Sequence, residues 1–380
     1  MVNLENYFKT GDINLIVNDI KKLRKYILKN AWRGFKSWLL SYIKSRFKKH
    51  TFRPVLAYLY TDLDCNVRCR YCYSQGKHIP GMTMDTAKKA VDYLKSIGCR
   101  VLAYMGGEPL VRKDFIIELT EYAVKNGFFV YLPTNGILLD EEFIDAIGKA
   151  GVATINLAID VVKPKEGLPK ALSIIIPQFE YLLEKEPEYG YITFLNINIT
   201  RKNLEDVKIL TEIAHRLNIA TDYHINEPPP IDYENFKYKE DGWWITPNEF
   251  DEVDNLVDWL IEKNKSGFTM VNSIEHLSLI KDFIRGKLRP WDCRAGELTF
   301  VIRLDGSFAP CFEMYGSDYD WGNVFAGVKF DREKLNELKK ECSTHCLSTC
   351  NFQVYHYTKS FLYSLQWVGK HAYSSLLGTS

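Results

Sequence analysis

The sequence predicts an α/β fold in which parallel strands alternate with helices. Three observations support this prediction. Six short apolar runs and five amphipathic patterns alternate between Pro54 and Ile225, Gly or Asn-Gly signals separate several of them, and hydrophobic residues make up 46% of the 380 residues. Alternation of this kind is typical of parallel strands that are joined by right-handed helical crossovers. The apolar content is sufficient to fill the core of such a domain.

The elements are expected in a fixed order along the chain. The predicted strands cover residues 54–61, 101–105, 128–132, 154–159, 191–199 and 220–225, and the predicted helices cover 82–97, 113–125, 141–149, 168–186 and 204–217. Asn126-Gly127 and Gly151 follow two of these helices and are typical stop signals. Beyond residue 228, a loop and two helices, at about 247–263 and 274–285, are expected to cover this domain, followed by a hairpin at 298–304 and 307–309.

A basic amphipathic segment precedes the first strand. Residues 20–61 contain twelve Lys or Arg and no Asp or Glu, although the whole chain has a net charge of only +1. Apolar and aromatic residues recur at helical spacing from Leu23 to Phe47, a composition typical of a helix that lies on an anionic membrane surface. Packing of this helix on the main domain and binding of RNA by its basic residues are the alternatives. Residues 1–20 are expected to form a weakly patterned lead-in.

The composition also predicts a location. No apolar run reaches the ~18 residues that are needed to span a bilayer. Nine Cys in a chain without a signal-peptide pattern indicate metal ligands in a reducing cytosol rather than disulfides. We therefore expect a cytoplasmic protein that is peripheral at the inner face of the cell membrane, with no nucleic-acid partner.

Three cysteines lie close together directly after the first predicted strand. Cys65, Cys69 and Cys72 are separated by three and two residues. Soft thiolate ligands favour iron–sulfur clusters, zinc or copper(I). A structural zinc site needs a fourth ligand, and His78, the nearest candidate, lacks the usual spacing. Three thiolates on a four-iron cluster would leave one iron open for chemistry, whereas buried thiols packed as small hydrophobes are the alternative without a metal.

The Cys-x3-Cys-x2-Cys spacing, with Tyr71 before the third Cys, resembles the signature of the radical S-adenosylmethionine (SAM) superfamily. The resemblance covers residues 53–225 and implies that the six strands form a partial (β/α)6 barrel. It also implies that Cys65, Cys69 and Cys72 hold a [4Fe-4S] cluster whose open iron binds SAM. One electron from a donor such as ferredoxin or flavodoxin would then cleave SAM to methionine and a 5′-deoxyadenosyl radical.

The same resemblance implies which residues border the cofactor. Residues 106–109, Gly-Gly-Glu-Pro, match the segment that meets the amino group of SAM in the superfamily, and two glycines would let the backbone approach a ligand closely. The expected cofactor-binding residues are Tyr71, Gly106, Gly107, Glu108, Pro109, Asn135, Asp160 and Asn198. Most of them follow a predicted strand, at the end where barrel enzymes keep their chemistry. Tyr104, His224 and Glu227 are weak catalytic candidates by location alone.

The C-terminal third has five further cysteines. Cys293-x-Ala-Gly, Asp305-Gly306, Pro310-Cys311 and Gly322-Asn323 resemble the auxiliary-cluster extensions called SPASM or twitch domains. This likeness implies a second [4Fe-4S] cluster held by four of Cys293, Cys311, Cys342, Cys346 and Cys350, the first two being the firmer ligands. A structural zinc ion at the same cysteines is the alternative.

These observations divide the chain into five regions. We expect a membrane-surface segment at 1–52, the radical SAM barrel at 53–227, covering elements at 228–290, the auxiliary-cluster region at 291–352 and an aromatic amphipathic tail at 353–380. This organisation is similar to that of membrane-lipid-modifying members, the adenosylhopene and calditol synthases. It implies C–H abstraction followed by carbon–carbon bond formation or rearrangement on a membrane lipid or its sugar headgroup.

Two other functions remain open at this point. The first is a SPASM-type maturase that modifies a ribosomally made peptide, although residues 1–50 are short and basic for a peptide-recognition domain. The second is a non-catalytic iron–sulfur electron carrier at the membrane. The intact Gly-Gly-Glu at 106–108 argues against a carrier, because a carrier needs no SAM pocket.

Overall fold

The computed structural model describes residues 2–18, 32, 52–72, 79–226, 244–342, 344–359 and 362. Most of the predicted basic helix at 23–47, most of the aromatic tail and the candidate Glu227 lie outside these residues. Within the described ranges, no helix is both long enough and apolar enough to cross a bilayer.

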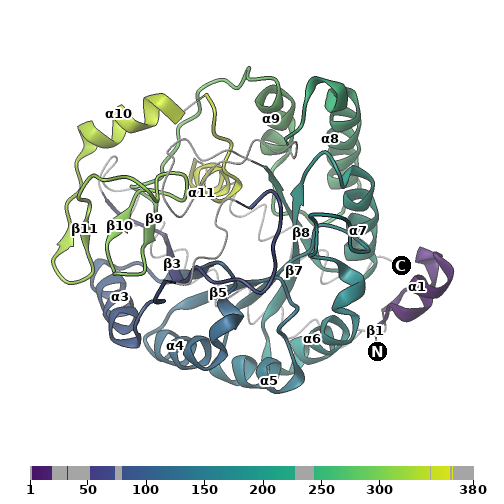
Figure 1. Ribbon diagram of the computed structural model, residues 1–380, viewed down its shortest axis with the longest axis horizontal. Coiled ribbons are helices and arrows are strands. Elements are labelled where there is room, and N and C mark those ends of the chain that lie inside the picture. The colour runs from purple at the N-terminus through teal and green to yellow at the C-terminus, as the bar shows by residue number, and fades with distance from the viewer. Residues whose placement is uncertain are drawn as a thin grey trace.

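The centre of the molecule is an eight-stranded sheet that curves into an open barrel (Figure 1). Its strands are β3 (Leu56–Asp62), β4 (Val101–Gly106), β5 (Phe129–Thr134), β6 (Thr154–Ala158), β7 (Ile192–Ile199), β8 (Ala220–Ile225), β9 (Thr299–Ile302) and β10 (Phe308–Ala309). The order is β10-β9-β3-β4-β5-β6-β7-β8, and all neighbours are parallel except the β9–β10 hairpin. The α/β prediction with six parallel strands is confirmed. The two edge strands of the described sheet, β10 and β8, do not pair with each other, so the barrel is open.

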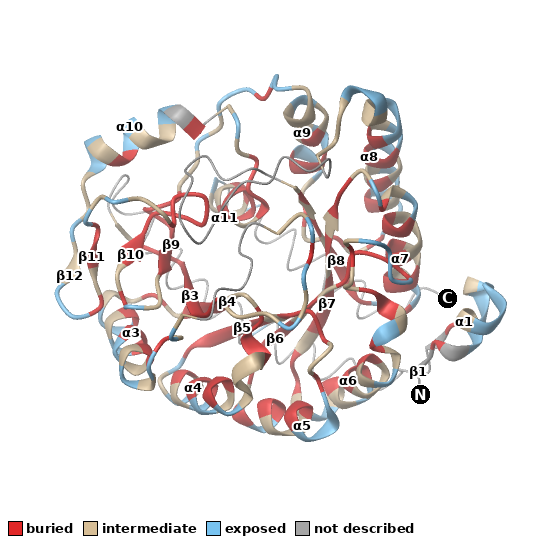
Figure 2. Ribbon diagram, in the orientation of Figure 1, coloured by how far each residue is buried: buried red, intermediate tan, exposed pale blue. Residues whose placement is uncertain are grey.

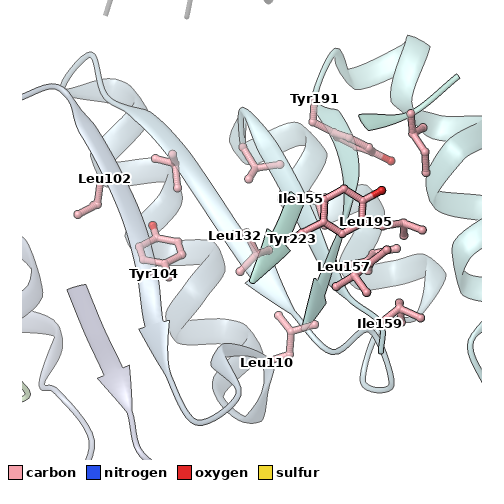
Figure 3. Packing of buried hydrophobic residues seen from close by; sticks show 14 of the residues in the cluster. Leu102, Tyr104, Leu110, Leu132, Ile155, Leu157, Ile159, Tyr191, Leu195 and Tyr223 are labelled. Atoms are coloured by element: carbon pink, nitrogen blue, oxygen red, sulfur yellow. The ribbon is translucent and has the colours of Figure 1, made fainter. Parts of the chain in front are cut away.

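The strands β3, β4, β5 and β9 separate two hydrophobic cores, because side chains alternate between the faces of a sheet. On β3, Ala57 and Leu59 pack under the outer helices, whereas Tyr58 and Tyr60 face the inside of the barrel. Figure 3 shows part of the outer core, in which Leu102, Tyr104, Ile155, Leu195 and Tyr223 pack together. The inner core is smaller, which leaves part of the barrel interior to polar side chains.

Helices surround the sheet on its outer face (Figure 1). They are α3 (Met84–Ile97), α4 (Lys113–Lys125), α5 (Glu141–Ala150), α6 (Ile176–Tyr189), α7 (Leu204–Arg216), α8 (Phe250–Lys265) and α9 (Ile274–Ile284). Side-chain caps begin several of them, for example Thr83 at α3 and Asp140 at α5, each accepting a backbone N–H three residues ahead. The alternation of buried and exposed residues along these helices is visible in Figure 2.

The predicted helix 168–186 begins too early. Residues 161–171 instead form a loop with bridges between Val161 and Ala171 and between Lys165 and Leu168, and α6 begins only at Ile176. Pro177 occupies its first turn, where a proline needs no hydrogen-bond partner. Pro177 thus marks the start of α6 in the sequence, but the apolar residues at 168–175 led to the prediction of an earlier start.

The predicted hairpin is confirmed, and the structure adds its position. β9 extends the main sheet beside β3, so the C-terminal region is continuous with the barrel. The remaining elements are β11 (Gly322–Asn323), β12 (Gly327–Val328), α10 (Arg332–Cys342) and α11 (Thr349–Lys359). Helix α11 joins the two edges of the barrel: Asn351 accepts a hydrogen bond from Thr299 of β9, and Thr349 donates to the carbonyl of Tyr223 in β8.

Residues 2–18 are more ordered than the weakly patterned lead-in that was expected. They form β1 (Val2–Asn3), α1 (Glu5–Thr10) and β2 (Val17–Asn18), and the two strands pair antiparallel. Leu4 is fully buried, and its N–H donates to the Glu180 carboxylate of α6 at 2.5 Å. Two buried residues twelve positions apart, Leu4 and Ile16, give too weak a periodicity to be predicted from sequence.

A buried carboxyl group on α6 predicts a pH-dependent stability. Burial raises the pKa of Glu186 to about 8, while hydrogen bonds from Thr193 lower it. The folded state therefore holds a proton that the unfolded chain loses above about pH 4.5, so stability falls as the pH rises from there towards 8. Glu186→Gln should stabilise the fold by on the order of 3 kcal/mol at pH 7 and by almost nothing at pH 4.

Urea unfolding at both pH values measures this effect. Glu184→Gln, two residues away on the same helix but exposed, is the matched control. Equal stabilisation at pH 4 and pH 7 would contradict the burial of a protonated Glu186.

Candidate functional site

The cysteine loop follows β3 at the carboxyl end of the sheet. Cys69 is buried, Cys65 and Cys72 are half-buried, and the Cys72 N–H donates to the Cys69 carbonyl at 3.1 Å. Burial raises the pKa of the Cys69 thiol to about 12; the Lys170 ammonium lowers it, and Asp160, Cys72 and Cys65 raise it further. The three thiols are therefore close enough to feel each other's charge, and positive charge is needed to make all of them thiolates.

Glu108 connects the cysteine loop to the ends of β4 and β5. Its carboxylate is 2% exposed and accepts hydrogen bonds from the N–H groups of Leu110 and Asn135, at 3.0 and 2.7 Å, and from the Thr134 hydroxyl at 2.7 Å. Burial raises its pKa, and these donors lower it. Asn135 in turn donates to Asn66, the residue after Cys65, at 2.7 Å. Both carboxylate oxygens thus serve the scaffold that positions the cysteines.

The two glycines of the Gly-Gly-Glu-Pro segment have a role that sequence did not reveal. A Cβ on Gly106 would lie 1.9 Å from the Asp62 carbonyl oxygen, and one on Gly107 would lie 2.0 Å from that of Asp64. The Gly107 N–H also donates to the Asp62 carbonyl at 3.0 Å. These glycines let the end of β4 pack against the backbone that leads into the cysteine loop, so their space is already filled by protein.

Gly106→Ala should therefore destabilise the fold more than its backbone angle alone requires. Gly106 has φ 144°, and Gly127 also has positive φ (83°) but no atom within 4 Å of the place where an added Cβ would lie. We expect Gly127→Ala to cost about 1 kcal/mol and Gly106→Ala to cost about 2 kcal/mol more because of the clash with Asp62. Urea unfolding of both variants measures the difference, and equal losses would contradict the close-packing role.

Asp160 is the centre of a second buried network. It is fully buried, and its carboxylate accepts hydrogen bonds from the Tyr71 hydroxyl at 2.6 Å and from the Asn198 N–H at 3.2 Å. The Lys170 ammonium lies 3.2 Å from the same carboxylate. Lys170 also lies over the Tyr71 ring, 5.2 Å from its centroid. Burial lowers the pKa of Lys170, but the opposite charges of Asp160, Cys69 and Cys72 raise it above its ordinary value. The network fixes Tyr71, and therefore the cysteine loop, against the end of β6.

Lys170 is the residue of this site that sequence patterns did not indicate. It lies in the loop 161–171, part of which was predicted to be helical, and its spacing from Asp160 carries no local pattern. The nearby Arg70 N–H donates to the Gly167 carbonyl at 3.0 Å, which brings the same loop to the cysteines. Only the tertiary contact between two loops shows that a cation faces the thiols.

The catalytic candidates lie in different places. Tyr104 faces the outer core, is fully buried and hydrogen-bonds to Thr120 of α4 at 2.9 Å, so its position gives no support for a catalytic role. His224 faces the barrel interior, with its Nε2 atom 3.2 Å from the Asn196 amide and 3.3 Å from the Asp222 carboxylate. Glu227 lies outside the described residues.

Four of the five C-terminal cysteines come together. Cys311 and Cys342 are buried with Ala295 and Met314, and Cys293 and Cys346 pack against them. Burial raises the pKa values of Cys293, Cys311 and Cys342, and the charges of neighbouring cysteines raise those of Cys311 and Cys342 further. A cavity of about 180 Å³ lies beside them, lined by Trp291, Asp292, Cys293, Glu297, Arg332, Asn336, Lys339, Cys342 and Cys346.

Cys350 is separate from this group. It packs in the inner barrel core with Tyr58. Burial is the largest cause that raises the pKa of the Tyr58 hydroxyl, and the charge of Cys350 is the second largest. Cys350 is in the first turn of α11, which faces β3, whereas Cys346 precedes the helix. Of the last three cysteines, Cys342 and Cys346 thus lie with Cys293 and Cys311, whereas Cys350 lies in the inner barrel core.

Both cysteine groups offer thiolates, which are the usual protein ligands of iron–sulfur clusters. Among the described residues, no three His, Cys, Asp or Glu side chains are spaced to hold one ion. A four-iron cluster holds its thiolates farther apart than one ion does, and its usual protein ligands are thiolates. The loop offers three thiols, and Cys293, Cys311, Cys342 and Cys346 offer four more. Lys170 and Lys339 place positive charge near the two groups.

Comparisons with known proteins agree with this arrangement. Residues 63–221 match the model of the Radical SAM superfamily. The AdoMet-dependent heme synthase of Methanosarcina barkeri is 30% identical over 190 residues, which are 45% of this chain and 53% of that protein. The GTP 3′,8-cyclase of Mannheimia succiniciproducens is 28% identical over 152 residues, 38% of this chain and 44% of that protein. The chain thus spans about half the length of these curated relatives.

Solved structures show the same fold at low sequence identity. Streptococcus suis SuiB bound to S-adenosylmethionine has a TM-score of 0.57 and 13% identity, covering 85% of this chain and 74% of that one. anSMEcpe with bound AdoMet and a peptide has a TM-score of 0.56 and 18% identity, covering 84% of this chain and 99% of that one. At these identities the likeness concerns the fold alone. Residues 63–221 thus match the Radical SAM superfamily model, and they lie within an open barrel of parallel strands.

Proposed function

We propose that the protein is a radical SAM enzyme in which Cys65, Cys69 and Cys72 hold a [4Fe-4S] cluster that binds SAM. The observation that carries this proposal is the cysteine loop, where three thiols share one site at the carboxyl end of β3. Once reduced by an external electron donor, a cluster held by these three thiolates would supply the one electron that reductive cleavage of SAM requires, and with it the capacity for hydrogen abstraction from the substrate.

The residues of this chain would position and shield that chemistry. Glu108 and Asn135 hold the cysteine loop at its start, and Asp160 holds it at Tyr71. Lys170 places a buried positive charge beside Cys69 and Cys72, which offsets the negative charge of the thiolates. Because the carboxylates of Glu108 and Asp160 already accept hydrogen bonds from protein donors, we propose that these two side chains act on SAM only indirectly, by holding the cysteine loop in place.

We further propose an auxiliary [4Fe-4S] cluster held by Cys293, Cys311, Cys342 and Cys346. The shared burial of these thiols and the adjoining cavity support this set. Lys339 donates to the Cys293 carbonyl at 2.7 Å and thereby keeps a cation at the edge of the site. A structural zinc ion is the alternative occupant.

The finer part of the proposal concerns the substrate. A membrane lipid or its sugar headgroup, modified by carbon–carbon bond formation or rearrangement, stays a prediction from the basic segment 20–61 and the aromatic tail. The relatives named above are a heme synthase and a GTP cyclase, and the structural neighbours include complexes with peptides, so peptide maturation remains the alternative. The location at the inner face of the membrane is part of the same proposal.

Anaerobic reconstitution tests the radical SAM activity. With dithionite as reductant, the protein should convert SAM to 5′-deoxyadenosine, and adding SAM should change the electron paramagnetic resonance spectrum of the reduced cluster. Absence of both would overturn the proposal. Flotation with anionic liposomes at low salt tests the membrane part separately, since the attraction is electrostatic and screened by salt; protein that does not float with them contradicts it.

A further inference from the structure

Several buried polar atoms on the inner wall of the barrel have no hydrogen-bond partner among the residues that the structure describes. They are Oδ1 of Asp222, Nδ2 of Asn198, Nδ2 of Asn226, and both Nε2 and Oε1 of Gln353. Gln353 is 7% exposed, so neither end of its amide is solvated. Leaving such groups unpaired costs about 1–3 kcal/mol each. In a native protein such groups are completed by a ligand, an ion or ordered water.

The strand register places three of these groups together. Asn196 pairs with Asp222 and Asn198 pairs with His224 across β7 and β8, and Asn226 follows at the end of β8. Their neighbours Leu195, Ile197, Tyr223 and Ile225 pack in the outer core. Because side chains alternate along a strand, the polar residues point into the barrel.

Helix α11 brings Gln353 to the same wall. Thr349 donates to the Tyr223 carbonyl at 3.0 Å, and Tyr357 donates to the Val271 carbonyl, beside β8, at 2.7 Å. Gln353 is four residues from each and therefore lies on the same helix face. Burial raises the pKa of Tyr357, and the negative charge of Asp222 raises it further. Helix α11 and Asp222 therefore face each other.

We propose that this wall, formed by β7, β8 and α11, binds an uncharged, hydroxyl-rich part of the substrate. The inference rests on the proposed function, because it names the substrate class of the same barrel. Asp222 Oδ1 would accept a hydrogen bond from a substrate hydroxyl group, and Gln353 Oε1 would accept one from another. The amide N–H groups of Asn198, Asn226 and Gln353 would donate hydrogen bonds to hydroxyl oxygens.

The charges on the wall favour this class over an anion. Within the described residues, Asp222 has no Lys or Arg in ion-pair distance, and His224 is its paired side chain. A carboxylate or phosphate at this position would face the Asp222 charge with no compensating cation. Across the barrel, Met105 and Tyr131 present partly buried apolar surface, which suits the C–H face of a sugar or cyclic polyol.

Equilibrium dialysis of the reconstituted protein with SAM tests the proposal. The probes are radiolabelled methyl α-glucopyranoside and myo-inositol, with citrate and a capped dialanine peptide as comparisons. We expect millimolar binding of at least one polyol and weaker binding of citrate and of the peptide. Preferential binding of citrate or of the peptide, or no polyol binding, would overturn the proposal.

Two variants locate the site. Gln353→Leu and the near-isosteric Asp222→Asn should each weaken polyol binding by roughly five- to tenfold, the effect of losing one hydrogen bond. Gln178→Leu is the matched control, since it removes another amide with an unpartnered buried oxygen, on α6 outside the barrel. Unchanged binding in both barrel variants, or equal weakening in the control, would overturn the assignment. If thermal melting shows that Gln353→Leu is unfolded, Asp222→Asn decides.

The two proposals fail separately. Polyol binding is measured without reductant and needs no SAM cleavage, whereas 5′-deoxyadenosine formation is measured without polyol. Cleavage of SAM by a protein that binds no polyol would overturn only the inference about the wall. Polyol binding by a protein that cannot cleave SAM would overturn the proposed function.

Discussion

Cys69→Ala is expected to reduce 5′-deoxyadenosine formation to the detection limit and to lower the iron content from about eight to about four atoms per chain. Cys69 is the buried member of the cysteine loop, and its backbone carbonyl is held by the Cys72 N–H. With only two thiols left, the loop can no longer hold a four-iron cluster that keeps one iron open for SAM. The remaining iron should belong to the auxiliary site, which shares no element with the loop.

Iron analysis and chromatography of the products measure this effect, and Cys99→Ala is the matched control. Cys99 is also fully buried, but it lies in the outer core, with its thiol 3.6 Å from the Val101 carbonyl. Its loss should leave both iron content and SAM cleavage close to those of the unsubstituted protein. SAM cleavage that persists in Cys69→Ala would show that the cysteine loop is not the SAM-binding site.

The sequence predicted those parts of the site that depend on local pattern. The six parallel strands follow from apolar runs of strand length, and the cysteine loop from its spacing. The segment 106–109 and Asn135, both expected near the cofactor, lie beside the cysteine loop. The roles of Glu108 and Asn135 were less accessible, because whether a carboxylate faces a ligand or caps a neighbouring turn depends on contacts between loops that are far apart in sequence.

Features that depend on long-range packing could not be predicted. Lys170 reaches the thiols only because a loop of irregular structure folds over the end of β6. Gln353 becomes part of the barrel wall only because α11 joins β9 to β8, which no periodicity in residues 349–359 reveals. Tyr104 is a catalytic candidate by location alone, and strand alternation turns it to the outer face.

The double variant Cys342→Ala/Cys346→Ala is expected to lose the auxiliary cluster and to keep SAM cleavage. Iron should fall from about eight to about four atoms per chain, and the remaining cluster should still respond spectroscopically to SAM. The reason is geometric: both cysteines border the same cavity as Cys293, next to the buried Cys311. Removing two of four thiolates leaves too few ligands for a cluster.

Cys350→Ala is the matched control for this experiment, because it removes the neighbouring cysteine of the same x3 series. Its thiol lies in the inner barrel core beside Tyr58, in the first turn of α11, whereas Cys346 precedes that helix. The iron content of Cys350→Ala should therefore stay at about eight atoms per chain. If Cys350→Ala loses four irons and the double variant keeps them, the auxiliary cluster is held by a different set of thiols, and Cys350 would be the connection between that cluster and the barrel interior.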